Sequence, residues 1–88
     1  MYTDGYSLEI TKKLAKLKQR DPKQNRIVHK KMDKILANPK HRYKDLHYSM
    51  KGIKRVQIGR FVLIFIIDHK NKIVSFEDYD HHDKIYKR

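Results

Sequence analysis

The chain has 88 residues, a formal net charge of +12 and no cysteine. The missing cysteine excludes disulfides, thiolate catalysis and cysteine-ligated zinc. The length supports a single domain over residues 1–88, and the excess of 22 basic over 10 acidic side chains favours nucleic acid, an acidic protein or a membrane surface as partner.

Two features argue against a membrane-spanning or secreted protein. The longest apolar run, Phe61 to Ile67, is far too short to span a bilayer. The first residues, Met1 to Gly5, lack the basic start and apolar stretch of a signal peptide. We therefore expect a cytoplasmic protein.

The first third of the chain predicts a strand and two helices. Tyr6, Leu8 and Ile10 alternate with polar residues, which is typical of a short strand. A helix is expected next, with Leu14 and Leu17 on one face and lysines on the other.

A second helix is predicted to start at Asp21-Pro22, because aspartate caps helices and proline suits the first helical position. Its apolar stripe consists of Ile27, Val28, Lys31, Met32, Ile35 and Leu36. Asn38-Pro39 should end it, with Asn38 in the left-handed conformation. The two helices should form an antiparallel hairpin.

The second half of the chain predicts three strands. Residues 39–52 show no clean period and are expected to form a basic, aromatic loop. Strands are predicted at 53–58, 60–67 and 72–78, with turns at Gly59 and at 69–72. Their short connections favour antiparallel pairing. The strand 60–67 is apolar on both faces, so helices should cover one side and partly apolar material the other.

These elements predict an α+β fold in the order β-α-α-β-β-β. A two-helix hairpin packs on one face of a small, mostly antiparallel sheet. The other face of the sheet is expected to be open and to carry the function.

Candidate functional residues gather on that open face. Within the strand 53–58, Val56 and Ile58 should face the helices, so Arg55 and Gln57 should face the open side. Arg60 begins the next strand and can point to the same rim. The tail after the last strand should bring His81, His82 and Tyr86 to this place.

This combination of arginine, histidine and tyrosine side chains suits RNA cleavage without metal. The 2′-hydroxyl can attack the phosphate when a base, an acid and cations are supplied. Histidine exchanges protons near neutral pH, arginine stabilises the phosphorane, and tyrosine can stack on a base or hold the nucleophile. The alternative is that the histidines are solvated surface residues and that the arginines only keep an edge strand soluble.

Several segments occur in the order and spacing of a known toxin superfamily. They are the lysine-rich helix with Leu14 and Leu17, the helix end Ile35-Leu36-Ala37-Asn38-Pro39, Leu46 with Met50-Lys51-Gly52, the strand pair Val56 to Phe65, and the tail His81-His82-Asp83-Lys84-Ile85-Tyr86. On these residues the chain resembles the RelE/ParE superfamily, the toxin halves of bacterial and archaeal toxin–antitoxin pairs. The resemblance covers nearly the whole chain.

The resemblance implies a type II toxin of the RelE branch, a ribosome-dependent endoribonuclease that cuts mRNA without metal or other cofactor. Tyr86 falls on the catalytic or base-stacking aromatic of the family, His82 on its tail arginine, and Arg55 on a strand cation that contacts phosphate. Val62 and Gln57 stand where the family has arginines, so Arg60 would have to substitute.

The expected catalytic residues are Arg55, Arg60, His82 and Tyr86, and the expected RNA-binding residues are Lys44, Lys51, Lys54, Gln57 and His81. The expected partners are mRNA, the ribosome and a RelB-like antitoxin with acidic, amphipathic segments.

Three alternatives remain open: a noncatalytic ParE-like toxin that inhibits DNA gyrase, a basic RNA- or ribosome-binding domain, and a metal site formed by His41, His47, His81 and His82. The last is disfavoured because two adjacent histidines cannot easily ligate one ion.

Overall fold

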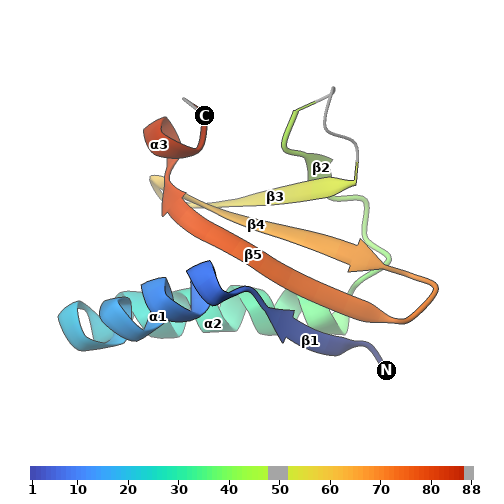
Figure 1. The fold of residues 1–88 in the computed structure, drawn as a ribbon, viewed down its shortest axis with the longest axis horizontal. Helices are drawn as coiled ribbons and strands as arrows, with labels where there is room; N and C mark the ends of the chain where they lie inside the picture. The colour runs from blue at the N-terminus through green and yellow to red at the C-terminus, as the bar shows by residue number, and fades with distance from the viewer. Residues whose placement is uncertain (48–51, 87–88) are drawn as a thin grey trace.

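The structure, a computed structural model, describes residues 1–47 and 52–86. Its elements are β1 (Thr3–Tyr6), α1 (Leu8–Arg20), α2 (Pro22–Ala37), β2 (Lys44–Asp45), β3 (Ile53–Ile58), β4 (Phe61–Asp68), β5 (Ile73–His81) and α3 (His82–Tyr86). The five strands form one sheet in the order β1-β5-β4-β3-β2, with α1 and α2 layered against one face (Figure 1). Within these residues, no helix has the length and apolar character that crossing a membrane requires. The predicted α+β class is confirmed.

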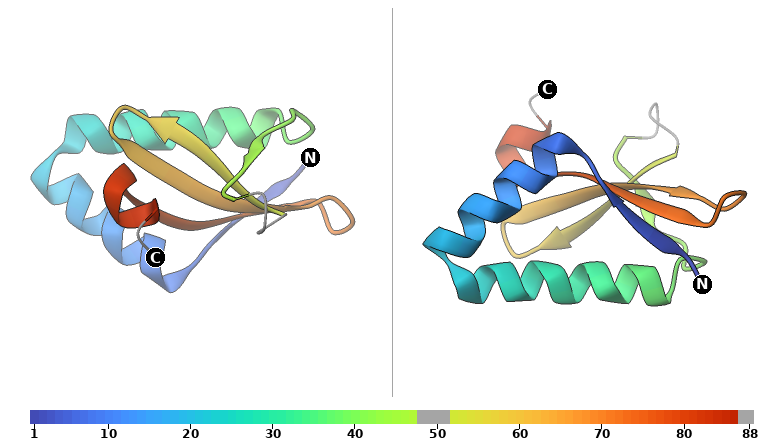
Figure 2. Two further views of the ribbon diagram at one scale, coloured as in Figure 1. Left: turned by 90° about the horizontal axis from the view of Figure 1, so that it is seen from above. Right: turned by 60° about the horizontal axis from the view of Figure 1, so that its bottom comes forward.

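Strand pairing follows the short connections, with one exception. β3, β4 and β5 pair antiparallel, as predicted, and β2 adds antiparallel to β3. β1 pairs parallel with β5, from Thr3 opposite Ile73 to Tyr6 opposite Phe76. Parallel neighbours need a long crossover, and here the α1–α2 hairpin and the antiparallel strands lie between them (Figure 2).

The predicted strand around Tyr6 to Ile10 is wrong beyond Tyr6. Ser7 caps α1 instead, because its hydroxyl accepts a hydrogen bond from the Ile10 backbone N–H at 3.1 Å. As residues of α1, Ile10 is fully buried and Leu8 is exposed. Alternating apolar residues over so short a stretch fit either structure, and the serine cap decides for the helix.

The helical hairpin forms as predicted. Asp21 ends α1 through its N–H, which donates to the Leu17 carbonyl at 2.7 Å, and starts α2 through its carboxylate, which accepts from the Gln24 N–H at 3.1 Å. Pro22 occupies the first helical position. The expected left-handed Asn38 is wrong, since its φ is −137° and its N–H donates to two carbonyls of the last turn.

The main core lies between this hairpin and the sheet. Its buried members come from α1, α2, β3, β4 and β5: Ile10, Leu14, Val28, Met32, Ile35, Ile58, Leu63, Phe65, Val74, Phe76 and Tyr79. Val56 also packs against this cluster, as its predicted face requires. Ile27 of the predicted stripe is 45% exposed and lies outside the cluster.

The opposite face of the sheet is less open than predicted. Val62, Ile64 and Ile85 form a second buried cluster, against which Leu46, Ile53 and Tyr86 pack. α3 and β2 lie on this side of the sheet, away from α1 and α2 (Figure 1). β2 lies within the predicted loop and α3 within the predicted tail, so the face expected to carry the function is framed by two elements that the pattern did not predict.

The two predicted turns are confirmed. Ile58 pairs with Phe61 across a two-residue loop, and the first loop residue, Gly59, has a φ of +62°. Glycine adopts this conformation without the strain that a Cβ brings, as type II′ hairpins require. The β4–β5 connection is held by Asp68, whose carboxylate accepts from the Asn71 backbone N–H and side-chain amide.

Candidate functional site

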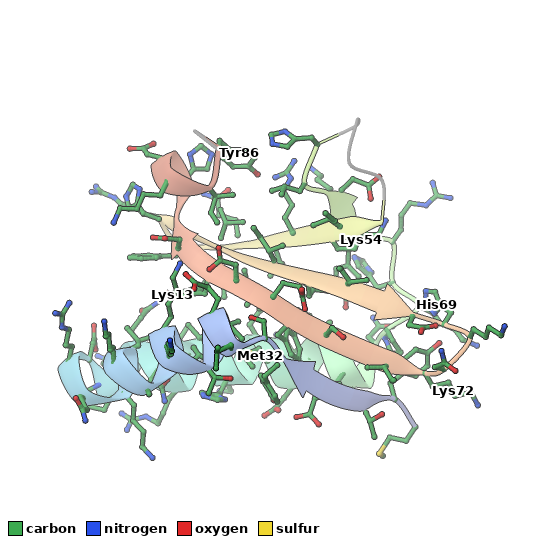
Figure 3. All side chains as sticks on the ribbon, in the orientation of Figure 1. Lys13, Met32, Lys54, His69, Lys72 and Tyr86 are labelled. Carbon is green, nitrogen blue, oxygen red and sulfur yellow. The ribbon has the colours of Figure 1, made fainter. Side chains whose placement is uncertain are left out.

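Three side chains meet around the phenol ring of Tyr86 in α3. The His82 ring lies 4.6 Å from it between centroids, and the His47 ring lies 5.6 Å from it at an interplanar angle of 77°. The guanidinium carbon of Arg55 lies 5.9 Å from the ring centroid. Tyr86 projects from α3 on the side of the sheet opposite the helical hairpin (Figure 3). Residues from three segments of the chain therefore share one place.

α3 is held in position by one apolar and one polar contact. Ile85 is almost fully buried against Val62 and Ile64. The His82 backbone N–H donates to the Arg60 carbonyl at 2.9 Å, which joins the start of α3 to the β3–β4 turn. Tyr86 is the fourth residue after His82, the spacing that places two side chains on one helical face.

β2 places the remaining two members. The Arg55 Nε donates to the Asp45 carbonyl at 3.0 Å, which orients the guanidinium along the edge of the sheet. The Leu46 N–H donates to the Ile53 carbonyl at 2.7 Å, and its side chain joins the second cluster. His47 follows directly and so reaches Tyr86.

The fixed charges near the site are mainly positive. Lys44 pairs directly with Arg55 across β2 and β3, so both side chains leave the same face of the sheet. The nearest carboxylate along α3 is Asp83, whose oxygen lies 3.6 Å from His82 Nδ1 and is largely exposed. The arrangement can hold an anion beside two imidazoles and a phenol.

The structure brings together three of the four predicted catalytic residues: Arg55, His82 and Tyr86. The fourth, Arg60, has an exposed side chain and touches the site through its carbonyl, which accepts from the His82 N–H.

Three of the predicted RNA-binding residues have other contacts. Lys54 forms an ion pair with Asp45 at 2.7 Å, on the opposite face of β3 from Arg55. The Gln57 amide donates to the Gly59 carbonyl at 2.9 Å and supports the turn. The expectation that His81 joins the rim is wrong, because its ring packs at 5.5 Å against Phe61, on the side of the helical hairpin. Lys51 lies outside the described residues.

His47 was not predicted as a member of this site. Its approach to Tyr86 depends on the two-residue strand β2, which has no periodicity to recognise. The only signal was its place in a basic, aromatic loop. Within the described parts of the chain, no three histidine or acidic side chains gather closely enough to hold a metal ion, so the four-histidine metal site receives no support.

An apolar groove of about 560 Å³ adjoins the site. Its floor is formed by Ile53, Ile64 and Ile66, and its walls come from the β2 segment, α3 and the start of α1. The remaining lining residues are Ser7, Glu9, Leu46, His47, Glu77, Asp78 and Ile85. The side chains of Arg55, His47, His82 and Tyr86 form the phenol site. The groove meets this site at His47 and at the α3 turn that carries Ile85 and Tyr86.

No protein-family model matches the chain. An uncharacterized protein of Methanosarcina mazei is 51% identical over 98% of this chain and all of its own length. A protein of Methanocaldococcus jannaschii with the name "Putative toxin RelE4" is 47% identical over the whole of this chain and 94% of its own length.

Among solved structures, a chain of the toxin–antitoxin complex RelBE2 from Mycobacterium tuberculosis superposes with a TM-score of 0.75. The superposition covers 92% of this chain and 98% of that one, at 22% identity, and so shows the fold. The full-length likeness to the M. jannaschii protein shows the family as well. The chain belongs to the RelE family of toxins.

Proposed function

We propose that this protein is the toxin of a type II toxin–antitoxin system and that it cleaves mRNA on the ribosome. The observation that carries the proposal is the meeting of Arg55, His82 and Tyr86 on one side of the sheet. A RelE-family chain with a net charge of +12 has the electrostatics to attract an RNA backbone.

The proposed chemistry needs no metal. The 2′-oxygen attacks the adjacent phosphorus, and the 5′-oxygen leaves. Arg55 stabilises the charge that develops on the phosphorane, with Arg60 as a second cation from the neighbouring turn. His82 and Tyr86 position or transfer the protons. Lys44, opposite Arg55, extends the phosphate-binding surface.

The direct test is cleavage of a defined mRNA on translating ribosomes, followed by mapping of the new ends. We expect fragments with 2′,3′-cyclic phosphate and 5′-hydroxyl ends, and unchanged cleavage in EDTA. The same mRNA without ribosomes serves as the control and should be cut far more slowly. Complete loss of activity in EDTA, or intact mRNA on translating ribosomes, would contradict the proposal.

An antitoxin is the expected protein partner. The fold is shared with a chain of a solved toxin–antitoxin complex, which motivates the proposal. The strong positive charge favours an acidic antitoxin, and the apolar groove beside the site offers a surface for its apolar side chains.

One observation favours a second candidate, a noncatalytic toxin that inhibits DNA gyrase. Val62 stands where the resemblance places an arginine, and it is only 1% exposed beneath α3. An arginine there could not reach the phosphate without displacing Ile85, so the site has lost one cation. Inhibition of gyrase supercoiling by a protein that leaves ribosome-bound mRNA intact would establish this alternative.

A further inference from the structure

We infer that His47 is a catalytic residue, which forms an acid–base pair with His82 around Tyr86. The inference rests on the proposed function, because it assigns protons in the proposed cleavage reaction. It assigns proton transfer to the two imidazoles and leaves Tyr86 to position them with its ring and the reacting oxygen with its hydroxyl.

Geometry singles out these two histidines. All six histidines lie in the described part of the chain, and His47 and His82 are the two whose rings contact Tyr86. The others are occupied or remote: His29 is exposed on α2, His41 packs on Tyr43, His69 bonds the Tyr2 hydroxyl, and His81 packs on Phe61.

The chemistry requires two proton-transfer groups. As the O2′–P bond forms, the 2′-hydroxyl proton goes to a neutral imidazole. As the P–O5′ bond breaks, the leaving 5′-oxygen receives a proton from an imidazolium. The products are a 2′,3′-cyclic phosphate and a 5′-hydroxyl, so atoms and protons balance. One histidine cannot hold both protonation states at once, and histidine is the side chain that supplies either state near neutral pH.

The nearest fixed cation favours binding of the phosphate beside the two rings. Arg55 approaches the same phenol ring and attracts the phosphate. The groove that His47 also lines is mainly apolar; two of its carboxylates, Glu9 and Asp78, contact Lys13, and none of the described residues that line it is a lysine or arginine. His47 thus stands at the boundary between the cationic site and the apolar groove. Asp83, at 3.6 Å from His82 Nδ1, is the carboxylate nearest the other imidazole.

The first test compares His47→Phe with His47→Ala in ribosome-dependent cleavage. Phenylalanine keeps an aromatic ring against Tyr86 but cannot carry a proton, so both variants should slow cleavage by about 10²–10⁴-fold. His29→Ala, an exposed histidine on α2, is the matched control and should cleave normally. Near-normal cleavage by His47→Phe would overturn the inference, because only packing would then be needed.

The second test identifies the acid. A substrate with sulfur in place of the bridging 5′-oxygen at the mapped cleavage position has a leaving group that needs no proton. One variant of the pair, His47→Ala or His82→Ala, should recover most of its rate on this substrate, and the other should stay slow. Recovery by neither variant or by both would overturn the pair. Intact mRNA with the unaltered protein would overturn the proposed function itself, whereas normal cleavage by His47→Phe defeats only the assignment of His47.

Discussion

At the scale of single residues, the site depends on a guanidinium that is oriented by the backbone. The Arg55 Nε donates to the Asp45 carbonyl at 3.0 Å, and the guanidinium carbon lies 5.9 Å from the centroid of the Tyr86 ring. A fork that binds two phosphate oxygens differs from the point charge of lysine. The shape of the side chain, and not only its charge, should matter for cleavage.

We therefore expect both Arg55→Ala and Arg55→Lys to slow cleavage on ribosomes. Removal of one electrostatic stabiliser typically costs about 10²–10³ in rate, and lysine should recover only part of this loss. Arg26→Ala, an exposed arginine on α2, is the matched control. Single-turnover rates measure the effect. Equal rates for Arg55→Lys and the unaltered protein would show that charge alone suffices.

Two substitutions of Tyr86 test the role of its ring and the role of its hydroxyl separately. Tyr86→Phe keeps the ring that His47, His82 and Arg55 approach, whereas Tyr86→Ala removes it. We expect at least about a tenfold loss for Tyr86→Phe and a larger loss for Tyr86→Ala.

The double variant His82→Ala, Tyr86→Phe should be nearly inactive and still bind ribosomes, because both changes leave the fixed cations in place. Cosedimentation with ribosomes measures that binding. Full cleavage by the double variant would contradict the proposed roles.

The sequence predicts a site residue when the local strand pattern places it, and misses one that is placed by a contact between separate segments. Strand alternation predicted the side of Arg55. A β-bulge in β5 between Phe76 and Asp78 reverses the alternation and so puts His81 on the opposite side from the site. His47 was missed because a hydrogen bond from Leu46 to Ile53, rather than any pattern, carries it to Tyr86.

At the scale of elements, α1 is tied to the part of β5 that leads into the site. Lys13 Nζ lies 2.8 Å from an Asp78 oxygen and 2.9 Å from an Asp80 oxygen, and Asp78 is nearly buried. Figure 3 shows Lys13 on α1 beside this end of β5. Because α3 begins immediately after β5, the contact helps to position His82.

Lys13→Met should destabilise the protein by about 1–3 kcal/mol. The substitution keeps most of the apolar stem but removes the hydrogen bonds to two partly or fully buried carboxylates. Lys12→Met, the exposed neighbour, is the matched control and should change stability by less than about 0.5 kcal/mol. Urea unfolding midpoints measure both. Equal midpoints would show that the ion pairs contribute nothing net.

The same contact predicts a pH dependence of stability. Burial raises the pKa of the Asp80 carboxyl, but the hydrogen bonds from Lys13 and the His81 N–H, together with the charges of Lys13 and Lys84, outweigh burial and lower the pKa below its usual value. A group with a lowered folded-state pKa contributes stability above its unfolded pKa and loses it as pH falls through the folded one. We expect the unfolding midpoint to fall below about pH 4, and to fall less steeply in Lys13→Met. Parallel curves for the two proteins would contradict this.

The elements that were predicted correctly have strong local signals. Asp21-Pro22 marks a helix start through a cap and a preset φ. β4 follows from a long apolar run, and β3 and the start of β5 follow from shorter stretches with apolar residues between turn signals. β1 was misplaced because Thr3–Tyr6 is short and polar and gains its partner from β5 far along the chain. α3 has five residues and one buried side chain, Ile85, too few to form a helical pattern.

At the scale of the whole molecule, the net charge of +12 is the property that most affects which partners bind. Such a charge repels itself in the folded state, and an acidic partner relieves that repulsion. The proposed antitoxin would do so while it covers the cationic site.

Expression of the chain alone should therefore arrest growth of the host, and co-expression with an acidic antitoxin encoded beside it should restore growth. The double variant His82→Ala, Tyr86→Phe serves as the control, since it should still bind the antitoxin without arresting growth. Growth curves and copurification measure the two effects. Harmless expression of the unaltered, folded chain would argue against the toxin proposal.

The same charge should make ribosome binding strongly dependent on salt. Each phosphate contact releases counterions, so the logarithm of the affinity falls linearly with the logarithm of salt concentration. Lys44 and Arg55 leave one face of the sheet, whereas Lys23 and Lys30 are exposed on α2 in the layer behind it. Lys54 is a poorer choice for neutralisation, because its ion pair with Asp45 would also be lost.

The pair of variants Lys44→Gln and Arg55→Gln should each make the salt slope shallower by about one unit, and together by about two. Lys23→Gln and Lys30→Gln remove the same charge from the helical layer and should leave the slope nearly unchanged if phosphate is bound at the phenol site. Ribosome affinities at four or more salt concentrations provide the slopes. Equal slope changes for both pairs would mean that net charge, rather than the surface around Tyr86, governs binding. A flat response in the unaltered protein would contradict a phosphate-driven interaction altogether.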